Sequence, residues 1–138
     1  MAAFQKFNPF LEACFEKKHD FSSDTFKVML TNVAPVAANG VRADLTEIAA
    51  GNGYVAGGNA INISDSSQTN GTYTAALDTD VDFIALGGVI GPFRYVACYN
   101  ESAINDELVS FYDRGASLTL QDGETFRLDV GASLFTAV

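Results

Sequence analysis

Short alternating segments separated by turn dipeptides run through most of this chain, and this spacing constrains the fold more than any other feature. In such a segment successive side chains point to opposite faces, as in a β-strand. The joints contain Asn-Gly, Gly-Gly and Asp-Gly pairs, which are typical of tight turns. The predicted strands are residues 25–32, 60–67, 71–78, 81–88, 91–100, 107–113, 116–121 and 125–130.

This pattern favours an all-β fold, a jelly-roll-like β-sandwich of about eight strands. The main alternative is an immunoglobulin-like sandwich, but the sequence has no Trp and its two cysteines lie far apart. A length of 138 residues suits one domain. We expect a short N-terminal arm and helix in about residues 1–20 and the sandwich in about residues 24–138.

One helix is predicted before the strands, in the segment FNPFLEACFEKKHD. Asn8 is a suitable N-cap, and Pro9 fits the first helical position, where its missing N–H costs nothing. Apolar residues recur every three or four positions and form one stripe. The stripe contains Phe7, Phe10, Leu11, Cys14 and Phe15, and the last turn contains Lys17, Lys18 and His19.

The segment GPFRYVACYN is apolar on both faces of the predicted strand. Phe93, Tyr95 and Tyr99 fall on one face by alternation, and Val96 lies on the other. A strand of this kind is buried on both sides. One cover is the second sheet, and the other is the N-terminal helix or a neighbouring subunit. Because Tyr is enriched at interfaces, Tyr99 and Tyr112 are expected nearer to an interface than Phe93.

Charge and hydropathy argue against two classes of partner. The formal net charge is −9, with 17 acidic and 8 basic side chains, so the surface repels phosphate backbones and nucleic-acid binding is not expected. No apolar run approaches the roughly 18 residues of a membrane span. The N-terminal MAAFQKFNPF lacks the pattern of a signal peptide, which predicts a cytosolic product. Cys14 and Cys98 are therefore expected to be buried free thiols.

Few residues suggest chemistry, and we predict no enzyme, cofactor or metal site. The segment GNGYVAGG has no helix after it, so it predicts a loop with positive φ angles in place of a dinucleotide site. Asp78, Asp80 and Asp82 alternate before a strand; solvated charges are favoured there, and a calcium ion remains an open alternative. His19 is the only histidine, and its predicted role is to end the helix.

Residues 35–59 form the one long irregular segment, rich in glycine and small residues. A loop of this length in a small domain is usually functional or mobile. It is therefore the first candidate contact region.

Two long patterns cover nearly the whole chain. The first is FNPF.EA..EK.HD..SDT.KV.LTN.AP.A...V..D.TEIAAGNGY.AGGN, from Phe7 to Asn59. The second is GPFRYV..YN......L...YD.G.S.TL.DGETF..D, from Gly91 to Asp129. Both resemble a pattern of small virion structural proteins of tailed bacteriophages, with capsid cement or decoration proteins as characterised relatives. The resemblance implies a jelly-roll-like oligomer on the outer surface of a capsid, made in the host bacterial cytoplasm, without catalytic residues.

The function implied is that of a capsid cement protein that bridges subunits of the major capsid protein. It would act as a homodimer, or alternatively as a homotrimer, and would gain affinity by gripping several shell subunits. A tail or head–tail connector component is the first alternative. The second is a carbohydrate-binding jelly-roll module, in which Tyr54, Tyr73 and Asp78–Asp82 form an aromatic platform with a calcium site.

Candidate interface residues come from three places: the N-terminal segment, the glycine-rich loop and the aromatic strands. The N-terminal segment either reaches a neighbour as an arm or covers its own sandwich. The sequence does not distinguish which face contacts a shell. The candidates are Phe4, Phe7, Phe10, Asn52, Tyr54, Tyr99 and Tyr112.

Overall fold

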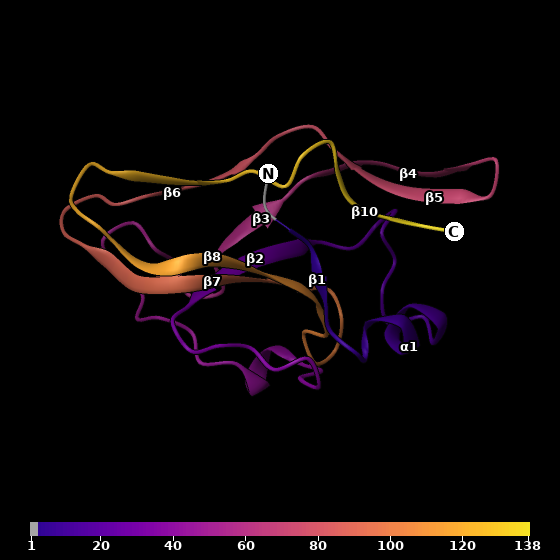
Figure 1. The fold of residues 1–138 in the computed structure, drawn as a ribbon, viewed down its shortest axis with the longest axis horizontal. Coiled ribbons are helices and arrows are strands. Elements are labelled where there is room, and N and C mark those ends of the chain that lie inside the picture. The colour runs from indigo at the N-terminus through magenta and orange to yellow at the C-terminus, as the bar shows by residue number, and fades with distance from the viewer. Residues whose placement is uncertain (1–2) are drawn as a thin grey trace.

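The predicted alternation produces a β-sandwich in the computed structural model, which describes residues 3–138 (Figure 1). The elements are β1 (Gln5–Lys6), α1 (Phe10–Phe15), β2 (Phe26–Thr31), the 3₁₀ helix η1 (Arg42–Asp44), β3 (Asn59–Ile61), β4 (Ile63–Thr69), β5 (Thr72–Leu77), β6 (Val81–Ile84), β7 (Ile90–Asn100), β8 (Leu108–Leu120), β9 (Thr125–Leu128) and β10 (Ser133–Ala137). The expected all-β sandwich with one short N-terminal helix is confirmed. Ten strands take the place of about eight.

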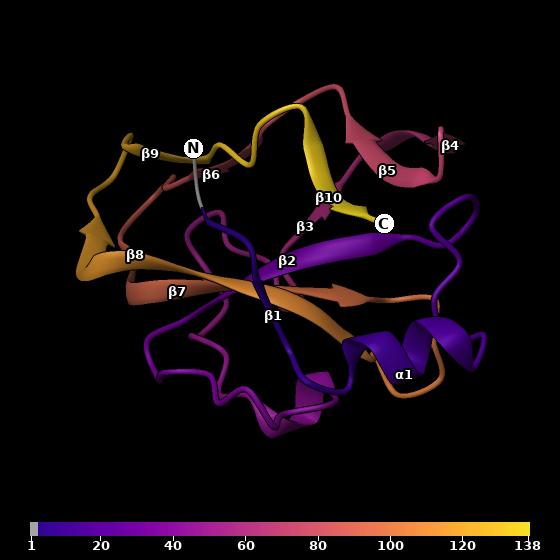
Figure 2. The same ribbon diagram turned by 45° about the vertical axis from the view of Figure 1, so that its right-hand side comes forward.

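Two layers of antiparallel strands make up the sandwich. One layer is a five-stranded sheet in the order β1-β8-β7-β2-β3. The other contains a three-stranded sheet, β10-β5-β4, and a two-stranded sheet, β6-β9 (Figures 1 and 2). The helix α1 lies at one end of the molecule, and the turn between β6 and β7 lies at the opposite end of the long axis (Figure 1).

The hairpins follow the turn dipeptides. Asn70 and Gly71 have φ angles of 51° and 83° and connect β4 to β5, as the Asn-Gly pair predicts. The two predicted strands 107–113 and 116–121 are joined into the single long strand β8, because the chain continues through Gly115 at a φ of 95°. Glycine adopts this angle without the strain that a Cβ would bring.

Strand β7 is buried on both faces over its second half, as predicted. Val96 and Cys98 face the core between the layers, whereas Ala97 and Tyr99 belong to a second apolar cluster on the other side of the sheet. Phe93 joins the core of Val96, because the pairing with β8 shifts register between Phe93 and Tyr95. The prediction that Phe93 and Tyr99 share a face is therefore wrong; an irregularity in pairing displaces the alternation.

The second cover of β7 is the N-terminal arm together with the segment after β2. Phe7 is fully buried against β7 and β8, with its ring centroid 5.0 Å from that of Phe111, and Leu45 packs on the same cluster. The N-terminal helix was one of the two expected candidates for this second cover. It does not cover β7 on that face; its Phe10 lies in the main core between the layers. The aromatic bulk of β7 thus packs within its own chain.

Helix α1 is shorter than predicted. It ends at Phe15, and Lys17 has a φ of 65°, which a right-handed helix does not allow. No basic residue lies in its last turn. Of the predicted stripe, Phe10 is buried, but Leu11 is 46% exposed and Phe15 is 86% exposed. The structure therefore leaves part of the helix's apolar surface uncovered.

Strand β10 was not predicted; its sequence is SLFTA, in which Leu134 is buried and both neighbours, Ser133 and Phe135, are partly buried. It pairs with β5 and forms one edge of the three-stranded sheet. The segment before β3 runs without strands, as expected. The positive φ angles predicted for the loop GNGYVAGG are confirmed at Gly51, Gly53, Gly57 and Gly58. At Gly58 a Cβ would lie 1.8 Å from the carbonyl oxygen of Val28, so only glycine fits there.

Candidate functional site

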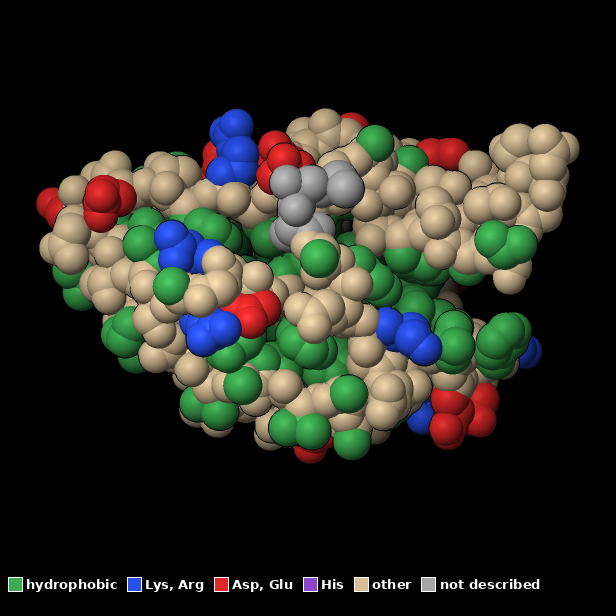
Figure 3. Space-filling view, viewed as in Figure 1, with side chains coloured by type: hydrophobic (Ala, Val, Ile, Leu, Met, Phe, Trp, Pro, Cys, Tyr) green, Lys and Arg blue, Asp and Glu red, His purple; other side chains and the backbone are tan. Residues whose placement is uncertain are grey.

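A groove of about 1120 Å³ lies between α1 and the inner side of β5 and β10. Its floor is aromatic. The ring of Phe135 lies 5.4 Å from that of Phe10, 4.9 Å from that of Phe21 and 5.9 Å from that of Phe4. Tyr73 packs on the same ring from β5, with centroids 5.7 Å apart. We call this hollow the α1 groove; Figure 3 shows its hydrophobic floor.

The rim of the α1 groove is basic although the protein is acidic. Lys6 on β1 and Lys17 after the helix both line the groove. Within residues 3–138 neither lysine forms an ion pair. Asp20 also lines the groove, but its carboxylate accepts hydrogen bonds from Ser22 and Ser23, which lower its pKa. The groove thus combines apolar area with unpaired positive charge.

Cys14 is the one thiol in this groove. Burial raises its pKa to about 11, so the thiol is protonated at neutral pH. A protonated thiol is a poor nucleophile and a poor metal ligand. Cys98 is buried in the core, and neither cysteine forms a disulfide. Cys98 is therefore the buried free thiol that the sequence predicts, whereas Cys14 is a free thiol that is only partly buried.

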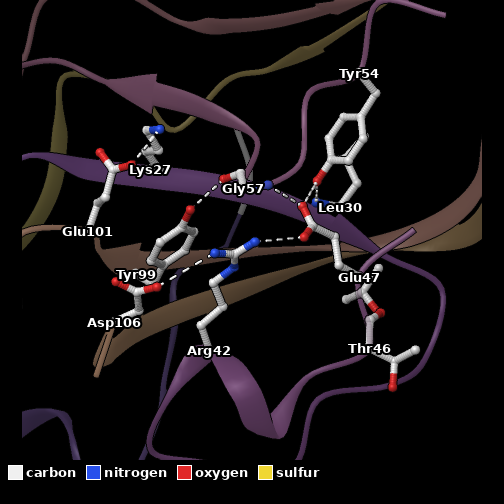
Figure 4. A network of polar contacts seen from close by, with 11 residues as sticks. Lys27, Leu30, Arg42, Thr46, Glu47, Tyr54, Gly57, Tyr99, Glu101 and Asp106 are labelled. Atoms are coloured by element: carbon white, nitrogen blue, oxygen red, sulfur yellow. Dashed lines mark hydrogen bonds and ion pairs between the residues drawn. The ribbon is translucent and has the colours of Figure 1, made fainter. Parts of the chain in front are cut away.

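A second site surrounds Glu47, in the irregular segment before β3 (Figure 4). Its Oε2 accepts hydrogen bonds from the Tyr54 hydroxyl at 2.6 Å and the Gly57 N–H at 2.6 Å, and its Oε1 accepts one from Arg42 Nη2 at 2.8 Å. Burial alone would raise the pKa of Glu47. The three donors outweigh burial and lower it, because they stabilise the ionised form.

The Glu47 cluster fastens the irregular segment to the five-stranded sheet. The Leu30 N–H of β2 donates to the Tyr54 hydroxyl at 3.0 Å, and the Tyr99 hydroxyl of β7 donates to the Gly57 carbonyl at 2.6 Å. The guanidinium of Arg42 lies 5.2 Å from the centre of the Tyr99 ring, which favours a cation–π contact. All of these polar groups are engaged, so the cluster serves to hold the segment in place.

His19 lies inside the protein and beyond the end of α1 at Phe15, so the prediction that it ends the helix is wrong. It is 8% exposed, and its Nδ1 lies 3.2 Å from Asn100 Nδ2. The same amide donates to Asp24 Oδ2 at 2.7 Å. Burial lowers the pKa of His19, because a charged imidazole would lose its hydration. His19 therefore helps to join the α1 region to the end of β7.

Most of the predicted interface residues pack inside the chain. Phe7, Phe10, Tyr54, Tyr99 and Tyr112 are all at most 3% exposed. Their side chains offer no area to a partner in this conformation, so the structure assigns them to internal packing. Phe4 is partly buried in the α1 groove, and Asn52 is exposed near the β6–β7 turn. Large aromatic side chains that the sequence analysis assigned to a contact surface instead fill the main core and the second apolar cluster.

The residues of the carbohydrate-site alternative do not come together. Tyr54 is buried beneath Glu47, whereas Tyr73 lines the α1 groove. Asp82 forms a bidentate pair with Arg127, at 2.7 and 2.9 Å, and Asp78 accepts a hydrogen bond from Asn62. No three His, Cys, Asp or Glu side chains within residues 3–138 are grouped as metal ligands.

An apolar patch at the opposite end was missed by the sequence analysis. Ile84, Leu86 and Val89 surround the β6–β7 turn and are 52%, 72% and 46% exposed. Asn52 holds this turn, because its carbonyl accepts from the Leu86 N–H at 2.8 Å and its side-chain amide donates to the Val89 carbonyl at 2.8 Å. We call these three side chains the turn patch. The run IALGGVI contains these residues, but the sequence analysis predicted residues 81–88 as a strand.

Comparisons with known proteins give no match. No protein family model, curated protein sequence or solved structure matches this chain. Within the described residues no helix is long and apolar enough to cross a membrane.

Proposed function

We propose that this protein is a structural virion protein of a tailed bacteriophage, a capsid cement or decoration protein without catalytic activity. It binds the outer surface of the head and bridges subunits of the major capsid protein. The observation that carries the proposal is exposed apolar surface at both ends of one sandwich, the α1 groove and the turn patch. Uncovered apolar surface of this kind is typical of sites that bind other proteins.

Two separated contact surfaces suit a bridging role. A protein that holds two neighbours at once gains affinity from the second contact, which becomes intramolecular after the first has formed. A shell under outward pressure from packed DNA is stabilised by added contacts across its seams. The choice of a capsid protein among bridging proteins rests on the resemblance of the patterns from Phe7 to Asn59 and from Gly91 to Asp129 to those of tailed-phage structural proteins.

The charge distribution also supports a protein partner. Four of the basic side chains are neutralised by carboxylates within hydrogen-bond distance or close to it. These are Lys27, Arg42, Arg94 and Arg127. A net charge of −9 therefore dominates the surface, which disfavours contact with a phosphate backbone. A cement protein is separated from the genome by the shell and needs no basic patch.

The test is binding to expanded shells of the major capsid protein that lack this protein. We expect saturable binding of the labelled protein, a high copy number in stained gels of intact virions, and a higher melting temperature of the shell. Leu86→Ser removes the most exposed side chain of the turn patch and should weaken binding. Val36→Ser is the matched control, because Val36 is 60% exposed but belongs to neither surface.

Labelled protein that stays in solution with shells would contradict the proposal. So would a low copy number or a position on the tail, which would favour the tail or head–tail connector role. Density for the protein on the outside of an assembled head is the most direct measurement.

A further inference from the structure

We propose that two copies of this chain associate through their α1 grooves in a two-fold symmetric dimer, with Phe15 of each copy entering the groove of the other. The inference assigns a surface, an occupant and a symmetry. It concerns the purified protein alone and does not depend on the proposed function. In such a dimer the second copy occupies the groove, so the turn patch of each copy is the surface left to contact a shell subunit.

The groove is an unfilled hole in the apolar packing. Phe4, Phe10, Phe21 and Phe135 form a contiguous aromatic floor, and α1 and β5 form the walls. About 1120 Å³ is large enough to receive several side chains of a second protein segment. Figure 3 shows the hollow open to solvent beside the helix.

The same side of the molecule carries a matching projection. Leu11 and Phe15 are four residues apart and therefore lie on one face of α1. Phe15 is 86% exposed, the most exposed aromatic side chain among the described residues, and Leu11 is 46% exposed. An aromatic anchor that enters a pocket is the feature that dominates binding energy at protein interfaces.

Charge identifies a second copy as the occupant. Glu12 and Glu16 flank the apolar pair on α1, also four residues apart. The groove presents Lys6 and Lys17, and none of these four side chains forms an ion pair within residues 3–138. Glu12 on α1 and Glu16 at its C-cap, beside an apolar ridge, thus complement Lys6 and Lys17 at the groove, and both sets occur on one chain. Asp20 also lines the groove, but its carboxylate is already hydrogen-bonded to Ser22 and Ser23.

Symmetry follows from the position of the two features. Because Leu11 and Phe15 themselves line the α1 side of the groove, a two-fold axis beside α1 brings each helix to the groove of its partner. Such an interface is isologous: both grooves are filled at once and the assembly closes at two copies. Other occupants, such as an apolar segment of a different protein, would leave the purified chain monomeric.

The test is sedimentation equilibrium of the full chain over a wide concentration range. We expect the wild-type chain to reach a monomer–dimer equilibrium. Phe15→Ser should weaken dimerisation about 100-fold, because a two-fold interface contains this contact twice. Leu86→Ser, which removes an exposed side chain at the opposite end, should leave the dimerisation constant unchanged.

A charge exchange tests the orientation. Lys6→Glu with Lys17→Glu should weaken the dimer at least tenfold, and adding Glu12→Lys with Glu16→Lys should restore it, since each pair is reversed rather than lost. Lys18→Glu is the control for Lys17→Glu, because Lys18 is adjacent and exposed but does not line the groove. Near-ultraviolet circular dichroism verifies that each variant is folded.

Three outcomes would overturn the inference. They are a wild-type chain that stays monomeric or forms trimers, a Phe15→Ser variant that associates as tightly as Leu86→Ser, and a charge exchange that fails to restore the dimer.

Discussion

The irregular segment before β3 and the short helix α1 use their residues in opposite ways. The segment has almost no regular secondary structure, yet its polar groups are satisfied around Glu47 and its tyrosine is buried. The helix is regular, yet it leaves Leu11 and Phe15 exposed beside an open groove. The irregular segment is therefore packed and hydrogen-bonded within the chain. The helix, although regular, carries the apolar surface that has no partner.

Gly58→Ala should have the largest effect, because it forces the irregular segment off the sheet. Its Cβ would lie 1.8 Å from the Val28 carbonyl oxygen, and φ is 80°. We expect a loss of about 4 kcal/mol or more in the free energy of unfolding, measured by urea denaturation. Gly123→Ala is the control: φ is 88° but the Cβ meets no atom within 4 Å, so only about 1 kcal/mol of backbone strain is expected. Equal losses of unfolding free energy in the two variants would show that the contact with the Val28 carbonyl oxygen plays no part.

Glu47→Ala should come next, because it removes the acceptor of three hydrogen bonds. It leaves the Tyr54 hydroxyl without an acceptor and, within the described residues, leaves Arg42 with only Asp106 as an ion-pair partner, 3.5 Å away. We expect a loss of about 3 kcal/mol in unfolding free energy. The control is Glu101→Ala, which removes the carboxylate of an exposed ion pair with Lys27 and should cost less than about 1 kcal/mol. A Glu47→Ala variant as stable as the Glu101→Ala variant would contradict the role of Glu47 in holding the irregular segment on the sheet.

His19 should make the free energy of unfolding depend on pH. Its pKa is lowered in the folded protein from an ordinary value of 6.5, so the unfolded chain binds a proton first as the pH falls. The contribution of neutral His19 to stability is therefore complete above pH 6.5 and is lost as the pH falls below it. Unfolding free energies measured between pH 7.5 and pH 5 test this.

His19→Gln should flatten that dependence, because the titrating group is absent. The carboxylates of Asp82 and Asp113 also have lowered pKa values, from 3.8, and their effect begins only at more acidic pH. A slope that persists in the His19→Gln variant over this range would assign the effect to other groups.

Phe15→Ser should have the smallest effect on folding. Its side chain is 86% exposed in the monomer, so the free energy of unfolding of the monomer should change by less than about 0.5 kcal/mol. Phe10→Ala on the same helix should cost about 4 kcal/mol, because Phe10 is 2% exposed in the core. Thermal and urea unfolding at low protein concentration compare the two, and a large loss for Phe15→Ser would place that residue in the monomer's own packing.

Alternation and turn chemistry predicted the sandwich and most strands, because both are local properties of the sequence. The positions that were missed depend on distant residues. Phe93 changes face through a register shift against β8, and the Tyr99 hydroxyl finds its acceptor at Gly57. Strand β10 forms because β5 offers an edge on which it can pair. None of these partners is visible from neighbouring residues.

The candidate surfaces were harder to predict, since residue type alone does not distinguish core from contact. Tyr54 and Tyr112 were expected at an interface but fill the interior, while Leu86 was assigned to a strand and lies exposed in a turn. The apolar stripe of α1 was recognised, and the sequence indicated that its residues needed a partner. Only the three-dimensional arrangement shows that Phe10 finds one and Phe15 does not.

The hairpin of β4 and β5 has a practical consequence. Its tip, Asn70–Gly71, is exposed, and a Cβ at Gly71 would meet no atom within 4 Å. Tips of this kind accept inserted peptides with little loss of stability. The tip projects away from the β6–β7 turn along the long axis (Figure 1). An epitope or affinity tag grafted there would be displayed at the far side of a molecule anchored through its turn patch.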